Sequence, residues 1–519
     1  MLVLIILQCS ASRRSLLYEA SVATHLMFAL VAWASWFVLP IHGLPSNRYV
    51  LCGSPPVTIF QGSRVKGFAA SVAGSENGLE MGRMAKSPYL RVALLVDADW
   101  EVTMPGFDEC LDCDSLGHSS RMSYKKCKNQ GLHRNTEVSC RLARKRSGLP
   151  NQNGTWLTGR LMRYRNNELA LDFAECDLAD GSVRWIHEPD GPGKINVEMR
   201  LQRVGQPVGS GSKQVLESAT MLVELCLVRR PLMRLAFCAQ TLYNLPGLQR
   251  EVPWVVEDWL HYHMEYLGIE HAQLYDIDGS LEAALENWTR SRIHTRSFVS
   301  YEKRWPSTLS DDLARLSTEH PFCTEMHAYA HCATTQRALS RWVLMLHSPD
   351  EYVVPNRDKS GRKSLRGSLP FLVEQWESNN ALHGHVLGML AMKAVSFARG
   401  GPGSNGGDAA SQRGAVLHAS MLRSETFYHH AFFSNPEYCV CMGPHTCYHL
   451  SEEHPDPFVE LDYIQDSGST ILFLDQNDVV MHHYVEMTAH DRGRCATLLQ
   501  PCNLSDRSME WAVKMLRRS

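Results

Sequence analysis

Residues 232–278 contain the pattern that most restricts the fold, because two apolar runs flank a segment of helical periodicity. The first run reads LMRLAFCAQTLY (232–243), the helical segment spans 252–268, and the second run reads HAQLYDID (271–278). Apolar residues three and four positions apart predict a helix, and Gly268 stands where a helix commonly ends. Strand, helix and strand in this order form a βαβ unit, which predicts a parallel sheet.

The same alternation continues toward the C-terminus. The pattern predicts a helix from about residue 328 to 341, then a buried strand WVLMLH (342–347) and an acidic turn at Asp350-Glu351. Residues 399–414 (RGGPGSNGGDAASQRG) have low complexity and predict a disordered surface insertion.

The region before this pattern reads differently. Residues 88–230 hold short runs with many alternating or β-branched residues, separated by Gly, Pro, Asn and Asp, which is typical of a small all-β domain. The stretch 204–214 is either a long hairpin loop or a linker, and residues 41–87 show little periodic hydrophobicity and predict a flexible stem.

The N-terminal segment 21–40 (SVATHLMFALVAWASWFVLP) has about the 20 residues that cross a bilayer as a helix. Arg13 and Arg14 precede it, so the positive-inside rule places the N-terminus in the cytosol and the rest in the lumen. The alternatives are a signal peptide cleaved near Ala32-Trp33-Ala34 and a buried soluble helix.

Composition agrees with a luminal globular protein and excludes one class of partner. The chain has 519 residues with 16 cysteines, and several of these should pair in an oxidising lumen. Three N-glycosylation sequons begin at Asn153, Asn287 and Asn503, which is consistent with a glycoprotein. The net charge of −3 leaves no electrostatic footprint for nucleic acid.

Two acidic clusters follow predicted strands. Asp276-Ile277-Asp278 ends the second strand of the βαβ unit, and Asp350-Glu351 comes directly after WVLMLH. Ligands of open parallel sheets bind beyond the carboxyl ends of the strands, and paired carboxylates can hold Mn²⁺ or Mg²⁺ against a diphosphate. Each cluster can equally be an ordinary turn, because Asp and Gly favour turns.

The order of three motifs resembles glycosyltransferase family 92 over residues 232–490. The first motif is EDWLHYHMEYLGIEHAQLYDIDGS (257–280). The second is the succession Cys332, Trp342, Asp350-Glu351-Tyr352 and Pro355, and the third is His483-Tyr484. The resemblance implies an α/β GT-A fold, which is a Rossmann-like sheet with a metal site.

The same resemblance implies roles for individual residues. It implies that Asp350 binds Mn²⁺ or Mg²⁺ together with a histidine from the C-terminal part. The segments PHTCYHL and MHHY offer His445, His449, His482 and His483, and we expect His445 or His483. Asp276 and Asp278 would contact the nucleotide. Ser348 stands where the family has the first metal-binding Asp, and a hydroxyl is a weaker metal ligand than a carboxylate.

The resemblance also implies inverting transfer of galactose from UDP-galactose to a glycan. Inversion needs one general base that deprotonates the acceptor hydroxyl, and the candidates are Glu374, Glu425 and Asp456. We therefore expect a metal-assisted hexosyltransferase of the Golgi membrane, single-pass type II with a luminal catalytic domain. The alternatives are a non-catalytic glycan-binding protein on a degenerate transferase fold and a luminal metal-dependent hydrolase.

The expected organisation has six parts. They are a cytosolic tail (1–20), a transmembrane signal anchor (21–40), a stem (41–87), a β-rich accessory domain (88–230), a GT-A-like glycosyltransferase domain (231–500) and a C-terminal tail (501–519).

Overall fold

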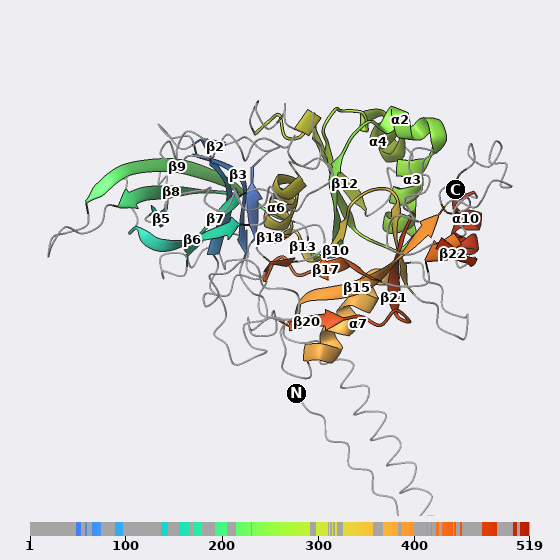
Figure 1. Cartoon of the computed structure of the whole chain (residues 1–519). Helices are drawn as coiled ribbons and strands as arrows, with labels where there is room; N and C mark the ends of the chain where they lie inside the picture. The colour runs from blue at the N-terminus through green and yellow to red at the C-terminus, as the bar shows by residue number, and fades with distance from the viewer. Residues whose placement is uncertain are drawn as a thin grey trace, which may run out of the picture. The chain divides into compact units, whose positions relative to one another are not determined.

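The structure of the chain is a computed structural model, and the account below covers the parts that it describes (Figure 1). These are residues 48–52, 58–59, 65–73, 89–96, 136–143, 155–165, 170–178, 193–204, 214–229, 231–290, 297–309, 311, 314, 317–318, 325–355, 367–381, 387–398, 413, 417, 422–424, 428–439, 441–442, 447–448, 470–484, 502–505 and 509–517.

Eight antiparallel strands of the N-terminal part close into a ring. The order is β1-β9-β8-β5-β6-β7-β4-β3, and β3 pairs back with β1, while β2 extends from β3. The bounds are β1 Tyr49–Leu51, β2 Thr58–Ile59, β3 Val65–Ala73, β4 Tyr89–Val96, β5 Thr136–Leu142, β6 Leu157–Arg165, β7 Ala170–Asp177, β8 Lys194–Val204 and β9 Val215–Leu227. Residues 65–73, within the expected stem, are therefore a strand of this ring.

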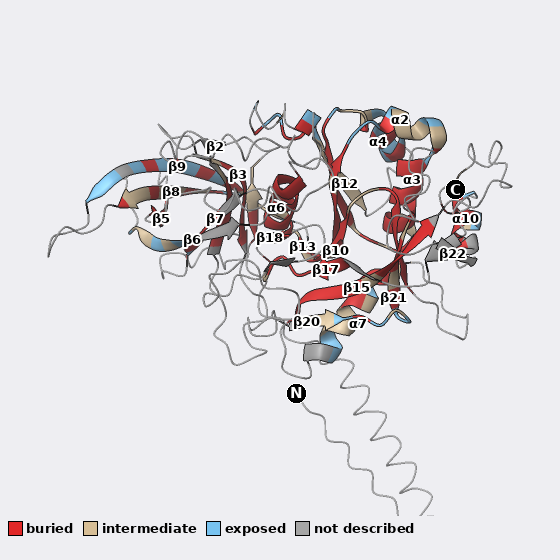
Figure 2. Ribbon diagram, in the orientation of Figure 1, coloured by how far each residue is buried: buried red, intermediate tan, exposed pale blue. Residues whose placement is uncertain are grey.

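Period-two alternation fills the ring with apolar side chains. Strands β5 and β8 alternate between buried and more exposed positions, and Figure 2 shows the same alternation along β9. The inward residues form one apolar cluster that includes Val138, Met199 and Met221. Disulfides Cys140–Cys176 and Cys52–Cys226 link strands of the ring covalently.

Gly159 of β6 is required by this packing. A Cβ added there would lie 2.5 Å from Cys176 Sγ and 2.6 Å from the Glu175 carbonyl oxygen. Any larger residue at position 159 must therefore displace the Cys140–Cys176 disulfide or the backbone of β7.

A mixed sheet of eleven strands forms the C-terminal part, in the order β12-β11-β10-β13-β17-β15-β16-β22, with β14, β20 and β21 off this path. The bounds are β10 Met233–Leu242, β11 His271–Asp276, β12 Phe298–Lys303, β13 Ser340–Leu346, β14 Glu351–Pro355, β15 Leu387–Ala398, β16 Leu422–Ser424, β17 Tyr428–Ser434, β20 Thr470–Phe473, β21 Val479–His483 and β22 Cys502–Ser505. Strands β18 (Cys441–Met442) and β19 (Cys447–Tyr448) pair separately.

The helices of this part are short. They are α2 Leu245–Glu251, α3 Val255–Leu260, the π-helix η6 His261–Tyr266, α4 Glu282–Arg290, α6 Glu325–Gln336, α7 Leu369–Ala381 and α10 Glu510–Leu516. The βαβ prediction for 232–278 is confirmed, because α3 and η6 connect β10 to the parallel strand β11. Gly268 follows η6 with φ +84°, as expected of a helix C-terminus.

The predicted fold class is nevertheless wrong. The described residues are mostly strand, in one closed antiparallel ring and one mixed sheet, and this is not a Rossmann-like α/β GT-A domain. Strands β12, β11, β10 and β13 run parallel in succession, but β13 then pairs antiparallel with β17, which in turn pairs antiparallel with β15. The error arose because one local βαβ unit was extended to the whole C-terminal half, where short apolar runs do not reveal strand direction.

A membrane-spanning helix was part of the same prediction. Among the described residues no helix has both the length and the apolarity needed to cross a bilayer. The predicted anchor at 21–40 lies outside these residues.

Helix α6 is buried at almost every position and joins the two sheets (Figure 2). Its apolar side chains pack in one cluster with Phe68 and Phe173 of the ring and with Val343 of β13. Disulfide Cys238–Cys332 fixes the helix to β10.

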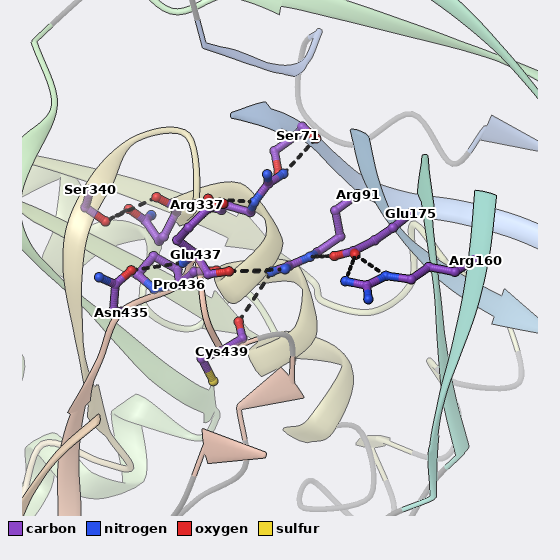
Figure 3. A network of polar contacts seen from close by, with 11 residues as sticks. Ser71, Arg91, Arg160, Glu175, Arg337, Ser340, Asn435, Pro436, Glu437 and Cys439 are labelled. Carbon is purple, nitrogen blue, oxygen red and sulfur yellow. Dashed lines mark hydrogen bonds and ion pairs between the residues drawn. The ribbon is translucent and has the colours of Figure 1, made fainter. Parts of the chain in front are cut away.

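A buried polar network lies where the outer face of the ring meets this part of the chain (Figure 3). Arg91 Nε lies 2.6 Å from Glu175 Oε1, and Arg160 Nη2 lies 2.6 Å from Glu175 Oε2. Arg91 also donates to the carbonyl oxygen of Pro436 at 3.0 Å, just after β17.

Arg337, after α6, extends the same network to the ring. Its Nε lies 3.1 Å from Glu437 Oε2, and its Nη1 donates to the Ser71 carbonyl oxygen of β3 at 3.4 Å (Figure 3). Burial raises the pKa of the Glu175 carboxyl group. The attraction of the guanidinium groups around it outweighs burial, so the pKa of Glu175 lies below its usual value.

Candidate functional site

The two predicted acidic clusters lie at the carboxyl ends of the parallel strands. Asp276 is the last residue of β11, and Asp350 follows the end of β13 at Leu346. Strand β10 pairs in parallel with both, so the carboxyl ends of β11 and β13 flank that of β10. The parallel strands thus bring the first and second predicted motifs to the same side of the sheet.

The Asp276 carboxylate organises the turn that leads into α4. Its Oδ1 accepts the Gly279 N–H at 3.0 Å, and its Oδ2 accepts the Leu281 N–H at 2.9 Å and the Tyr301 hydroxyl at 2.5 Å. The residue is buried, and burial raises the pKa of Asp276 despite these hydrogen bonds. Both oxygens are engaged within the protein, so the immediate role of Asp276 is to shape the loop.

Asp278 is the exposed member of the same cluster. Its Oδ2 accepts the Asn244 N–H at 2.8 Å and its Oδ1 accepts the Ser280 N–H at 3.0 Å, which ties the turn after β11 to the start of α2. Partial burial raises the pKa of Asp278, but its hydrogen bonds outweigh burial and hold the pKa below the usual value. An ionised carboxylate that solvent reaches can accept hydrogen bonds from a ligand at this edge.

The structure brings Asp350 together with His483, the predicted partner from the C-terminal motif. Strand β14 pairs antiparallel with β21, with Glu351 opposite His483. His483 Nε2 lies 3.4 Å from Asp350 Oδ2. Burial raises the pKa of Asp350, but the attraction of His483 and the hydrogen bonds from His483 and Ser348 keep it below the usual value.

Ser348, which replaces the expected first carboxylate, hydrogen-bonds Asp350 directly. Its Oγ donates to Asp350 Oδ1, so Ser348 and His483 each engage one oxygen of the same carboxylate. Among the described residues no group of three His, Cys, Asp or Glu side chains could hold a metal. Asp350 and His483 therefore supply two candidate ligands, and a bound cation would have to take the place of at least one of these contacts.

The aromatic and histidine residues of the first motif hold the acidic turn in position. Trp259 Nε1 donates to the Glu351 carbonyl oxygen at 2.9 Å, and the Tyr262 hydroxyl donates to the Val353 carbonyl oxygen at 2.8 Å. His263 Nδ1 lies 2.9 Å from the Trp259 carbonyl oxygen, and its Nε2 accepts the Val353 N–H at 3.3 Å. These residues fasten α3 and η6 to β14, directly beside Asp350.

Glu351 is held in the same turn. Its Oε2 accepts the His347 N–H at 2.7 Å, and the side chain is buried. The side chains at this strand end therefore include His347, Ser348, Asp350, Glu351 and His483.

Glu374, one predicted catalytic base, lies in a different place. It belongs to α7, whose first residues contact the amino ends of the parallel strands: Leu369 N–H donates to the Leu267 carbonyl oxygen just before β11, and Arg234 near the start of β10 lies over the Phe371 ring. The structure does not bring Glu374 to Asp350. The other predicted bases, Glu425 and Asp456, and the predicted ligand His445 lie outside the described residues.

Sequence reasoning missed two residues that complete the Asp276–Asp278 turn. Tyr301 on β12 and Asn244 before α2 have no motif around them, and only strand pairing reveals their proximity. The parallel pairing of β11 with β12 sets Tyr301 opposite Leu274, which is two residues before Asp276. No local sequence pattern predicts that pairing.

Comparison with known protein families, with curated proteins and with solved structures finds no match to this chain. The resemblance to glycosyltransferase family 92 therefore stays a prediction.

Proposed function

We propose that this protein transfers a hexose, with galactose as the first candidate, from a UDP-sugar to a glycan acceptor. The observation that supports this most is the pairing of Asp350 with His483 at the sheet edge that also carries Asp276 and Asp278. Two carboxylate clusters, at the ends of the strands that flank β10, suit a ligand that has a nucleoside at one end and a diphosphate at the other.

Each residue at the site has its own role in the proposed reaction. Asp278 accepts hydrogen bonds from the nucleoside, and Asp276 keeps the loop in shape. Asp350 and His483 are the residues that would hold a divalent cation, Mn²⁺ or Mg²⁺, which when bound neutralises the leaving diphosphate. A carboxylate base, for which Glu425 and Asp456 remain candidates, takes the proton of the acceptor hydroxyl as it attacks.

The compartment in this proposal is the lumen of the secretory pathway. Three disulfides lie among the described residues, and disulfides persist in oxidising compartments. The Golgi membrane and the anchor at 21–40 belong to the same proposal.

The direct test is release of UDP from UDP-galactose by the full chain with Mn²⁺ and a mixture of glycan acceptors. Asp350→Asn should lower turnover by at least about a hundredfold, because it removes the charge that would face the cation. Glu374→Gln is the matched control, since it makes the same acid-to-amide change at the other edge of the sheet, and it should leave turnover unchanged.

Two results would overturn the assignment. Unchanged turnover in Asp350→Asn would remove Asp350 from the chemistry. Turnover without UDP-sugar, as sugar release from a glycan, would indicate a hydrolase instead.

A second candidate is a glycan-binding protein without transferase activity. It is favoured by one observation, namely that Ser348 and His483 already engage both oxygens of Asp350. Calorimetry separates the two candidates: the second predicts no heat with UDP-galactose and Mn²⁺ but retained binding of glycans.

A further inference from the structure

Three side chains form a cluster on the outer face of the ring, across strands β6, β5 and β8. Trp156 directly precedes β6, and the register Cys140 to Leu157 places it across from Arg141. The guanidinium carbons of Arg141 and Arg200 lie 4.5 Å and 4.2 Å from the centroid of the Trp156 ring. We call Arg141, Trp156 and Arg200 the Arg–Trp cluster.

The two guanidinium groups differ in their partners. Arg141 donates from Nε to Glu198 Oε2 at 2.6 Å, so its charge is balanced. Arg200 donates from Nε to the Ser139 hydroxyl at 3.2 Å, and within the described part of the chain no carboxylate pairs with it. The terminal nitrogens of Arg200 therefore present an unbalanced positive charge at a partly exposed position.

Hydroxyl groups and one apolar side chain lie near this charge, beside the Glu198 carboxylate that pairs with Arg141. Register places Ser139 beside Thr158 and Arg200 beside Thr220, and neighbours across a strand pair lie about 5 Å apart. Leu222, two residues along β9, is 50% exposed. The face thus combines a cation, hydroxyls and apolar surface, which is the mixture that a sugar ring bearing an anionic substituent can satisfy.

We propose that the Arg–Trp cluster binds an acidic glycan, with its carboxylate or sulfate held by Arg200. A guanidinium group offers two parallel N–H donors to such an anion. Packing on Trp156 holds both guanidinium groups in place before the ligand arrives, which reduces the entropy lost on binding. This site lies on the ring and does not depend on the proposed transferase activity.

Local geometry, not overall charge, selects the ligand in this proposal. The chain carries a net charge of −3, so a general attraction for polyanions is not expected. Nucleic acid is accordingly the less favoured ligand, and it serves as an arm of the test.

The experiment measures binding of four oligomers to the full disulfide-bonded chain by calorimetry. They are a heparin hexasaccharide, a hexamer of galacturonic acid, maltohexaose and a six-nucleotide oligothymidylate. We expect binding of one or both acidic hexasaccharides, and their comparison identifies sulfate or carboxylate as the preferred group. Arg200→Gln should weaken this binding by at least about tenfold, because charge-assisted hydrogen bonds are lost.

Two further variants keep the result interpretable. Lys194→Gln removes one positive charge from the same strand β8, from a side chain that is 63% exposed and paired with Glu224, and it should change affinity by less than about twofold. Arg200→Lys keeps the charge but loses the paired donors, and its affinity should fall between those of wild type and Arg200→Gln.

Several outcomes would overturn the proposal. They are no binding of either acidic hexasaccharide, equal binding of maltohexaose, equal binding of the oligothymidylate, or an equal loss of affinity in Lys194→Gln and Arg200→Gln. Thermal unfolding of each variant checks that the ring remains folded.

Discussion

The ring and the mixed sheet differ in where they keep their buried polar groups. The interior of the ring is apolar, and the buried ion pair of Arg91 with Glu175 lies on its outer face. The mixed sheet instead carries buried histidines within its packed layers and carboxylates at its strand ends. The comparison suggests that the ring supplies a rigid body and that the strand ends of the mixed sheet supply chemistry.

The largest expected effect is that of acid. Low pH should destabilise the mixed-sheet part more than the ring, because the buried histidines belong to the mixed-sheet part. Burial lowers the pKa of His263 from 6.5 to about 3 and those of His327 and His331 to about 4. The unfolded chain then binds more protons below pH 6.5, so stability is lost as pH falls through that value. Each histidine should remove about 2 kcal/mol by pH 5, or roughly 6 kcal/mol together.

Urea unfolding at pH 7, 6 and 5 measures this loss. His327→Gln should reduce the pH dependence by about a third, since one of the three groups no longer titrates. An identical pH dependence in the variant would show that His327 is protonated as easily in the folded protein as in the unfolded one.

The next largest effect concerns the polar contact between the two regions. Glu175→Gln removes the negative charge that pairs with the guanidinium group of Arg91, which is 1% exposed. Loss of one partner of a buried pair costs about 3–5 kcal/mol, which thermal and urea unfolding would detect.

The exposed pair Lys194–Glu224 on the ring provides the control. Glu224→Gln should cost less than about 1 kcal/mol. If both glutamine variants were equally stable, the network in Figure 3 would not hold the two regions together.

A smaller loss of stability is expected from a substitution that disturbs only the packing within the ring. Gly159→Ala places a Cβ 2.5 Å from Cys176 Sγ and should destabilise by about 1–3 kcal/mol. Gly193→Ala is the matched control, because the nearest atom to its Cβ is Arg229 Nη2 at 3.9 Å. Equal melting temperatures for the two variants would contradict the tight packing of β6 on β7.

The smallest expected effect tests how much the hydrogen bond from Tyr301 to Asp276 stabilises the turn after β11. Tyr301→Phe removes the hydroxyl that donates to Asp276 Oδ2 and should cost about 1 kcal/mol in urea unfolding. Asp276 keeps its two backbone donors, so the fold should survive. A gain in stability would mean that this hydrogen bond is strained.

Local sequence patterns predicted individual helices and strands, whereas the arrangement of the strands in the sheets depends on pairing between distant segments of the chain. The strand 271–276 and the glycine at 268 follow from short-range periodicity and backbone chemistry. Closure of the ring depends on β1 meeting β9, which is separated from it by most of the N-terminal half. No local signal marks such a partner, so the segment before residue 88 reads as a stem.

The candidate site shows the same limit. Asp350 and His483 were both predicted as ligands, one from its place after a strand and one from a motif, and the β14–β21 ladder brings them together. Glu374 was one of three candidate bases, yet α7 begins at the amino ends of the parallel strands, on the opposite side of the sheet from Asp350. Sequence alone supplies residue types, and it does not say which strand end a helix faces.

The Cys52–Cys226 disulfide spans 174 positions of the chain and has a mechanical consequence. Tension applied to the backbone ahead of Cys52 passes through the sulfur bridge to Cys226, near the end of β9, and on to β10. Strands β2 to β8 stay out of this load path, so a protein tethered at its N-terminal side would transmit the pull to the mixed sheet without stretching the strands between the two cysteines.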